Sequence, residues 1–224
     1  MQMIKDELMS SREAILSRIR TALAQDPPLE PPPVPGVWPW RNPAPAEMAR
    51  RFAEELEAVH GEVIRAASMD EARKRLVELM EHEGWARLGA MDRRLCRDLA
   101  QGADPERIAW AQPDWTPPGM ADLPAALVEA DFLLADTGTA MIACGRAEER
   151  LLCYLPPACI VAATMDRLVE HLPAAWPEIA PRVADPKLRG EFVFITGPSR
   201  TTDIEKILIL GVHGPKRLIV LLVG

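Results

Sequence analysis

The chain has 224 residues, of which 48% are hydrophobic and 26% are charged, and this balance is typical of a globular domain. The net charge of −7 argues against nucleic acid or an anionic membrane surface as the main partner, because either would need a basic patch. No apolar run approaches the roughly 20 residues of a membrane span, and the N-terminus lacks the apolar core of a signal peptide. We therefore expect a cytoplasmic protein without a membrane span.

The first 45 residues predict a helical arm and a linker. Apolar residues recur there at helical intervals, at Ile4, Leu8, Ile15, Ile19 and Leu23. They predict an amphipathic arm over residues 1–26. Residues 27–45 are rich in proline, which donates no backbone hydrogen bond, and they predict an extended linker or a strap. The folded domain is then predicted over residues 46–224.

Helix-like and strand-like runs alternate through this domain. Helices are predicted over 46–59, 69–82, 92–99 and 165–172, and strands over 62–66, 86–90, 132–135, 140–144 and 158–164. Several of the strands are apolar throughout, which is typical of a sheet covered on both faces. The sequence therefore predicts an α/β fold with a mainly parallel sheet, made mixed by the strand pair around Gly138.

The C-terminal stretch "FVFITGPSRTTDIEKILILGVHGPKRLIVLLVG" predicts a strand–helix–strand unit. Phe192–Thr196 and Arg217–Val223 are apolar, strand-like runs. A helix is predicted between them, because Ile204, Ile207, Leu208 and Gly211 fall at helical spacing and Thr202 stands three residues before Glu205, as in a capping box. The turn from Gly197 to Asp203 would then lie at the carboxyl edge of the sheet, before a helix N-terminus.

This turn has two interpretations. Gly197 permits close approach, the hydroxyls of Ser199, Thr201 and Thr202 can donate, and Arg200 offers a planar cationic fork, so the turn suits a carboxylate or phosphate. In the alternative, Thr202 and Asp203 cap the helix and Arg200 is a solvated surface charge. The chemistry of the residues favours neither.

A second turn separates the strands of a hairpin. Asp136, Thr137, Gly138 and Thr139 form it, with Gly138 supplying a positive φ and Asp136 bonding the turn backbone. A structural hairpin is the simpler interpretation. In the functional interpretation, the same turn presents its hydroxyls and carboxylate toward the turn from Gly197 to Asp203, across a topological switch point.

The four cysteines lack the spacing of zinc or iron–sulfur ligands. Cys96, Cys144, Cys153 and Cys159 include no CxxC pair, and packing as buried thiols is the commoner role of such residues. A metal site shared by Cys144, Cys153 and Cys159 is the less favoured alternative. We expect no metal and no cofactor in this chain.

The segments "ADFLLADTGTAMI", "RLLCYLPPACIVAA" and "ITGPSRTTDIEKILILGVHGPKRLIVLLV" resemble the lactate-utilization protein C family, or LUD domain. The resemblance spans most of Asp131–Val223, and "REAILSRIRTALA" is similar to the usual N-terminus of that family. It implies an open Rossmann-like sheet related to ribose-phosphate isomerases (NagB/RpiA) and CoA transferases. The family's signature turns fall on Asp136–Thr139 and Gly197–Glu205.

The resemblance also implies a role in bacterial growth on L-lactate, beside two iron–sulfur proteins that would carry the clusters of an L-lactate-oxidizing system. In such a system Arg200 would pair with the lactate carboxylate, and His213 or Asp203 could handle a proton, although each also has a structural interpretation. No catalytic residue is carried over, so whether the chain is itself an enzyme stays open. The alternatives are a stand-alone enzyme acting on a sugar phosphate or CoA ester, and a non-catalytic ligand-binding scaffold.

Overall fold

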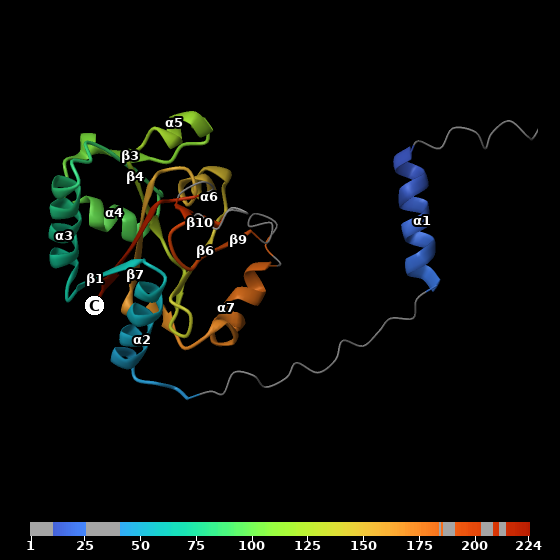
Figure 1. The fold of residues 1–224 in the computed structure, drawn as a ribbon, viewed down its shortest axis with the longest axis horizontal. Coiled ribbons are helices and arrows are strands. Elements are labelled where there is room, and N and C mark those ends of the chain that lie inside the picture. Colours follow the sequence, from blue (N-terminus) through green and yellow to red (C-terminus); the bar gives the residue numbers. More distant parts are fainter. Residues whose placement is uncertain (1–10, 26–40, 184, 186–190, 203–207, 211–213) are drawn as a thin grey trace, which may run out of the picture. The chain divides into compact units, whose positions relative to one another are not determined.

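A computed structural model describes residues 11–25, 41–183, 185, 191–202, 208–210 and 214–224 (Figure 1). The chain divides into two compact units, Met1–Pro39 and Trp40–Gly224. The first unit contains helix α1 (Ser11–Gln25), within the predicted arm. Ile15, Ile19 and Leu23 lie along this helix and are exposed.

Within the described residues, the second unit is built on a six-stranded parallel sheet, here called the main sheet. Its strands are β1 (Glu62–Ala66), β2 (Leu88–Ala90), β3 (Ile108–Trp110), β4 (Ala125–Glu129), β7 (Ala158–Thr164) and β12 (Arg217–Val223). Their spatial order is β1-β12-β7-β4-β2-β3, and every neighbouring pair is parallel. The central strands β7 and β12 are buried along almost their whole length, which explains their unbroken apolar sequences.

Helices cover both faces of the main sheet. They are α2 (Pro45–Ala58), α3 (Met69–His82), α4 (Arg94–Ala100), α5 (Pro117–Ala121) and α6 (Ala147–Leu152). Helix α3 begins where Ser68 Oγ accepts the Glu71 N–H at 3.2 Å, and Glu71 returns a bond to the Ala67 N–H at 2.9 Å. Right-handed crossovers place α3 and α4, which contact each other, on the face opposite α5 and α6.

A second, smaller sheet lies within the connections on the α5 and α6 side. Its order is β8 (Leu168–Val169), β5 (Phe132–Leu134), β6 (Thr139–Ala143) and β9 (Phe192–Ile195). Helix α7 (Leu172–Val183) packs on it through Ala175 and Ile179, which share a buried cluster with Phe132, Leu134 and Met141. The mixed pairing predicted around Gly138 is thus found in this small sheet, while the main sheet is parallel.

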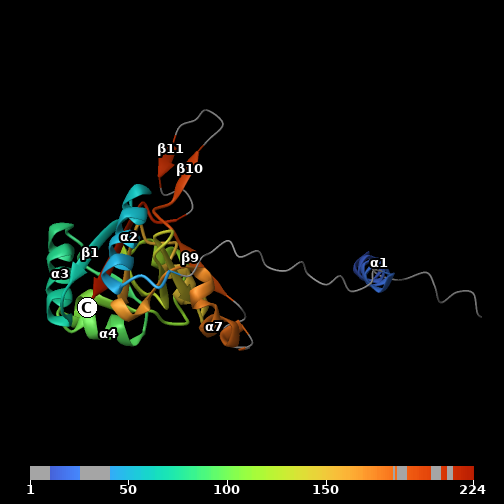
Figure 2. The same ribbon diagram turned by 90° about the horizontal axis from the view of Figure 1, so that it is seen from below.

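The predicted strand–helix–strand unit at the C-terminus is wrong. Strands β10 (Arg200–Thr202) and β11 (Leu208–Leu210) pair antiparallel, with Thr202 opposite Leu208, so both residues belong to a hairpin. Figure 2 shows this hairpin extending away from the two sheets. Strand β9 pairs with β6 of the small sheet and does not join β12. The helix dipole expected at this turn is therefore lost as an argument for anion binding.

The other predicted elements mostly match, with differences after residue 164. Helix α3 and strands β1 and β7 have the predicted bounds. The predicted helix over 165–172 is wrong, because a short 3-10 turn (Met165–Arg167) leads directly into β8. A second 3-10 turn (Pro105–Arg107) precedes β3. Strands β3 and β4 and helix α5 lie in the stretch from 100 to 130, for which the sequence predicted no regular element.

Candidate functional site

One edge of the small sheet gathers polar residues from four strands. Strands β5 and β8 are parallel and end there, β6 begins there, and β9, antiparallel to β6, ends there. The residues at or just beyond these strand termini are Asp136, Thr137, Thr139, Glu170 and Thr196, which we call the polar edge. The Asp136 N–H donates to the Glu170 carbonyl oxygen at 3.1 Å, which joins the two ends.

Three threonine hydroxyls of the polar edge form a chain. Thr137 Oγ1 donates to Thr139 Oγ1 at 2.9 Å, and Thr139 Oγ1 lies 3.0 Å from Thr196 Oγ1. Because Thr196 directly precedes Gly197, the two turns singled out in the sequence do lie side by side. The shared edge is that of the small sheet, however, and not a topological switch point of the main sheet.

Helix α2 covers both turn glycines. Gly138 has a φ of 60°, and a Cβ there would lie 2.5 Å from the Leu56 backbone nitrogen. A Cβ at Gly197 would lie 3.1 Å from the Val59 side chain, just past the end of α2. The close approach that the glycines were predicted to permit is therefore made by the protein's own helix.

A pocket remains open beside the first turns of α2. Its lining is Arg41, Pro43, Glu47, Met48, Arg51, Ala135 and Glu170. Glu170 is 9% exposed, and its carboxylate accepts the backbone N–H of Arg41 at 3.0 Å and that of Asn42 at 3.2 Å. Both guanidinium-bearing residues, Arg41 and Arg51, are exposed. Next to this lining, the buried Oδ1 of Asp136 accepts no hydrogen bond from any described residue.

The remaining residues of the predicted anion site are placed less favourably. The Ser199 N–H donates to the Pro215 carbonyl oxygen at 2.7 Å, which ties the turn to the start of β12. Arg200 is exposed at the base of the hairpin, and Thr201 and Thr202 continue β10. Asp203, Glu205 and His213 lie outside the described residues. The predicted role of this turn in anion binding stays a prediction.

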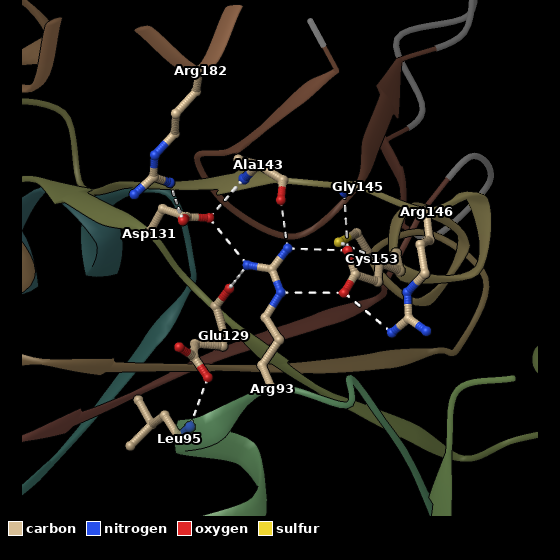
Figure 3. Close-up of polar contacts among 10 residues, drawn as sticks. Arg93, Leu95, Glu129, Asp131, Ala143, Gly145, Arg146, Cys153 and Arg182 are labelled. Carbon is tan, nitrogen blue, oxygen red and sulfur yellow. Dashed lines mark hydrogen bonds and ion pairs between the residues drawn. The ribbon is translucent and has the colours of Figure 1, made fainter. Parts of the chain in front are cut away.

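The topological switch point of the main sheet lies elsewhere, between β2 and β4. The chain leaves β2 toward β3 and leaves β4 toward β7, in opposite directions along the sheet. Arg93, at the end of the loop after β2, lies at this position, where its guanidinium reaches the end of β4. Figure 3 shows the carboxylates and carbonyl oxygens that surround it. Its guanidinium donates to Asp131 (3.1 Å), to Glu149 (3.1 and 3.3 Å), and to the carbonyl oxygens of Glu129 and Ala143.

The carboxylates around Arg93 are held on several sides. Asp131 also pairs with Arg182 of α7 and accepts the Ala143 N–H at 2.8 Å. Burial raises the pKa of Glu149, but the hydrogen bond and charge of Arg93 outweigh it, so the pKa is lowered overall. The same contacts raise the pKa of Arg93 against the opposing effect of burial. Since its five N–H groups are engaged, Arg93 acts as a structural lock rather than a ligand-binding group.

The two glutamates beside this lock do not form a nucleophile site of the CoA-transferase kind. Glu149 is engaged by Arg93 and by the Gly145 N–H at 3.1 Å. Glu148 is 7% exposed, and its Oε1 lies 3.4 Å from Arg146 Nε, an ion pair without hydrogen-bond geometry. Glu191, just before β9, pairs with Arg150.

The four cysteines are free and buried in the core. Burial raises the pKa of Cys159 to about 12, and a hydrogen bond with Cys144, together with burial, raises the pKa of Cys153. Protonated thiols are poor metal ligands. Among the described residues, no three His, Cys, Asp or Glu side chains are grouped so that they could hold a metal ion. No described helix is long and apolar enough to cross a membrane.

Sequence reasoning missed both the pocket and the Arg93 lock. Asp131 carried a signal, because a charge between the apolar runs of β4 and β5 requires a buried partner. The pocket carried none, since Arg41 and Glu170 meet across a separation of 129 residues.

The LUD domain family matches this chain over residues 49–223. The chain belongs to the LUD domain family. The match includes the main sheet, the small sheet, every residue of the polar edge and most of α2. The LUD domain thus begins within α2, and Arg41 and Glu47 of the pocket precede it.

Two curated relatives of this LUD domain chain are named lactate utilization protein C. The protein of Bacillus pumilus is 33% identical over 99 residues, which is 44% of this chain and 41% of the relative. That of Halalkalibacterium halodurans is 35% identical over 89 residues, 39% of each chain. These matches therefore span only about two fifths of the relatives' lengths.

A crystal structure of a DUF162 family protein from Deinococcus radiodurans has the same fold as this LUD domain. Its TM-score is 0.60 with 18% sequence identity, covering 81% of this chain and 99% of that one. At this level of identity, the likeness shows the fold alone.

Proposed function

We propose that this LUD domain protein functions in lactate utilization, as the subunit without clusters in an L-lactate-oxidizing system. Iron–sulfur partner proteins would carry the electrons, and this chain would bind a small carboxylate or other anion at the polar edge. The observation that carries the proposal is the 33–35% identity to two proteins named lactate utilization protein C.

The described chemistry of the chain is compatible with a binding role. The four thiols are buried, burial raises the pKa of Cys159 to about 12, and the glutamates of α6 are engaged by arginines. Polar groups that a ligand could reach are instead gathered at the polar edge and in the adjoining pocket. A subunit that positions a substrate for partners needs such a site and no redox group of its own.

Reconstitution tests this function. The chain is purified alone and together with the iron–sulfur proteins encoded beside it, and L-lactate-dependent reduction of a dye is measured. We expect dye reduction from the mixture and none from either part alone. Turnover by the isolated chain would contradict the subunit role and favour a stand-alone enzyme. Equal turnover by the partners without this chain would remove it from the reaction.

A further inference from the structure

The position of α2 decides which part of the polar edge a ligand can reach. The last turns of α2 close over Gly138 and Gly197, as the short Cβ distances at both glycines demonstrate. The first turns instead present Glu47, Met48 and Arg51 to the pocket. A small molecule can therefore approach the edge beside Ala135 and Glu170, whereas the end of α2 covers the backbone at Gly138 and Gly197.

The pocket combines two kinds of charge in one place. Arg41 and Arg51 supply two guanidinium groups, each a planar donor that fits a carboxylate. Glu170 already accepts the backbone N–H groups of Arg41 and Asn42, which stabilise its negative charge. Glu47 is exposed at the rim and can accept a hydrogen bond. The lining thus offers donors for an anion and an acceptor for a neighbouring hydroxyl.

The apolar part of the lining limits the ligand further. Met48 and Ala135 offer apolar surface suited to a methyl group or a short carbon chain. A simple carboxylate would leave the acceptor unused. The set of groups fits a short acid with a hydroxyl beside its carboxylate.

We infer that this pocket binds a 2-hydroxycarboxylate of three or four carbons. Arg41 and Arg51 hold its carboxylate, Glu47 accepts its hydroxyl hydrogen, and Met48 and Ala135 contact its carbon chain. The inference deepens the proposed function and rests on it for the choice of lactate as the first probe. It assigns the anion to Arg41 and Arg51 rather than to Arg200 of the hairpin.

The experiment titrates the protein, residues 1–224, with L-lactate and measures binding by calorimetry or by NMR chemical shifts. Propionate, which lacks the hydroxyl, and inorganic phosphate serve as comparison ligands. We expect saturable binding of L-lactate, several-fold weaker binding of propionate, and weaker binding of phosphate still. Arg51→Gln and Arg41→Gln should each weaken L-lactate binding about tenfold or more, since each removes a charge-assisted contact.

Arg50→Gln is the matched control. Arg50 neighbours Arg51 in the same helix but pairs with Glu54 at 2.6 Å on the surface and does not line the pocket. We expect it to leave the affinity within twofold, and the melting temperature of each variant shows whether it is folded. Equal effects of Arg50→Gln and Arg51→Gln would reduce the contact to general surface charge and overturn the inference.

Two further outcomes separate the site from the proposed function. If wild type shows no saturable L-lactate binding, or if Arg200→Ala abolishes binding while Arg51→Gln does not, the pocket is not the site. If L-lactate binds and its affinity depends on Arg51, yet the reconstituted system shows no lactate-dependent turnover, the binding site is supported and the proposed function fails.

Discussion

At the scale of single residues, Arg93 should matter most for stability. It joins the loop after β2 to the β4–β5 connection, the end of β6 and helix α6. Replacing it with methionine leaves Asp131 and Glu149 buried without their common cation, so we expect a loss of about 3–5 kcal/mol in the free energy of unfolding. Urea denaturation measures this loss. Arg50→Met, at an exposed pair, should cost less than about 1 kcal/mol, and a similar loss in both variants would contradict the lock.

Glu149 should give this lock a dependence on acid. Its pKa in the folded protein is lowered below the ordinary value of 4.5, so its contribution is present above that pH and is lost as the pH falls through the folded value. Glu149→Gln should therefore destabilise the protein at pH 7 and flatten the decline of stability below pH 4.5. Melting temperatures from pH 7 to pH 3 test this, and parallel curves for wild type and variant would refute it.

At the scale of elements, the packing of α2 on the β5–β6 turn should depend on Gly138. A Cβ there meets the α2 backbone at 2.5 Å, whereas at Gly84, which has a similar φ of 66°, nothing lies within 4 Å. Gly84→Ala should thus cost about 1–2 kcal/mol for the left-handed backbone, and Gly138→Ala clearly more. Chemical denaturation of both variants isolates the steric part. Equal losses of unfolding free energy in the two variants would mean that α2 can shift away from an added Cβ at little cost.

Elements with strong local signals could be predicted from the sequence. Helix α3 has a capping serine and buried Ala72, Leu76 and Met80 on one face, so its bounds were correct. Local signals failed where strand pairing determines the structure. The spacing around Leu208 predicted a helix, but Leu208 lies in β11, which pairs with β10. Helix α7 was missed because Pro177 and Pro181, which usually break helices, lie inside it.

The candidate site follows the same division. The turn from Asp136 to Thr139 was recognised from turn chemistry, and at the polar edge its Thr139 meets Thr196, the residue before the predicted turn from Gly197 to Asp203. The pocket depends on contacts between segments far apart in the chain, such as Arg41 with Glu170. Sequence spacing carries no information on such contacts, so the cationic side of the site was placed on Arg200 alone.

At the scale of the whole molecule, the main sheet and the small sheet are connected by ion pairs as well as by apolar packing. Asp131, between β4 of the main sheet and β5 of the small sheet, pairs with Arg93 at the N-terminus of α4 and with Arg182 on α7. The apolar clusters are separate for the two faces of the small sheet, one of them shared with the main sheet. Loss of either sheet would leave buried charges unpaired, so we expect both to unfold together.

The boundary between the two units leads to the last prediction. Trp40–Gly224 is a compact unit that contains both sheets, the pocket and the Arg93 lock. Near its start, the backbone N–H groups of Arg41 and Asn42 donate to the Glu170 carboxylate. Removing residues 1–39 should therefore leave a single cooperative transition with a melting temperature within about 4 °C of the full chain, a shift equivalent to about 1 kcal/mol or less at this size. A longer truncation, of residues 1–43, also deletes both N–H donors to Glu170 and should lower the melting temperature further. Calorimetry of the two truncated proteins decides the matter: if the shorter truncation already unfolds the domain, the N-terminal unit supports the fold and the division at residue 40 is not one of independent stability.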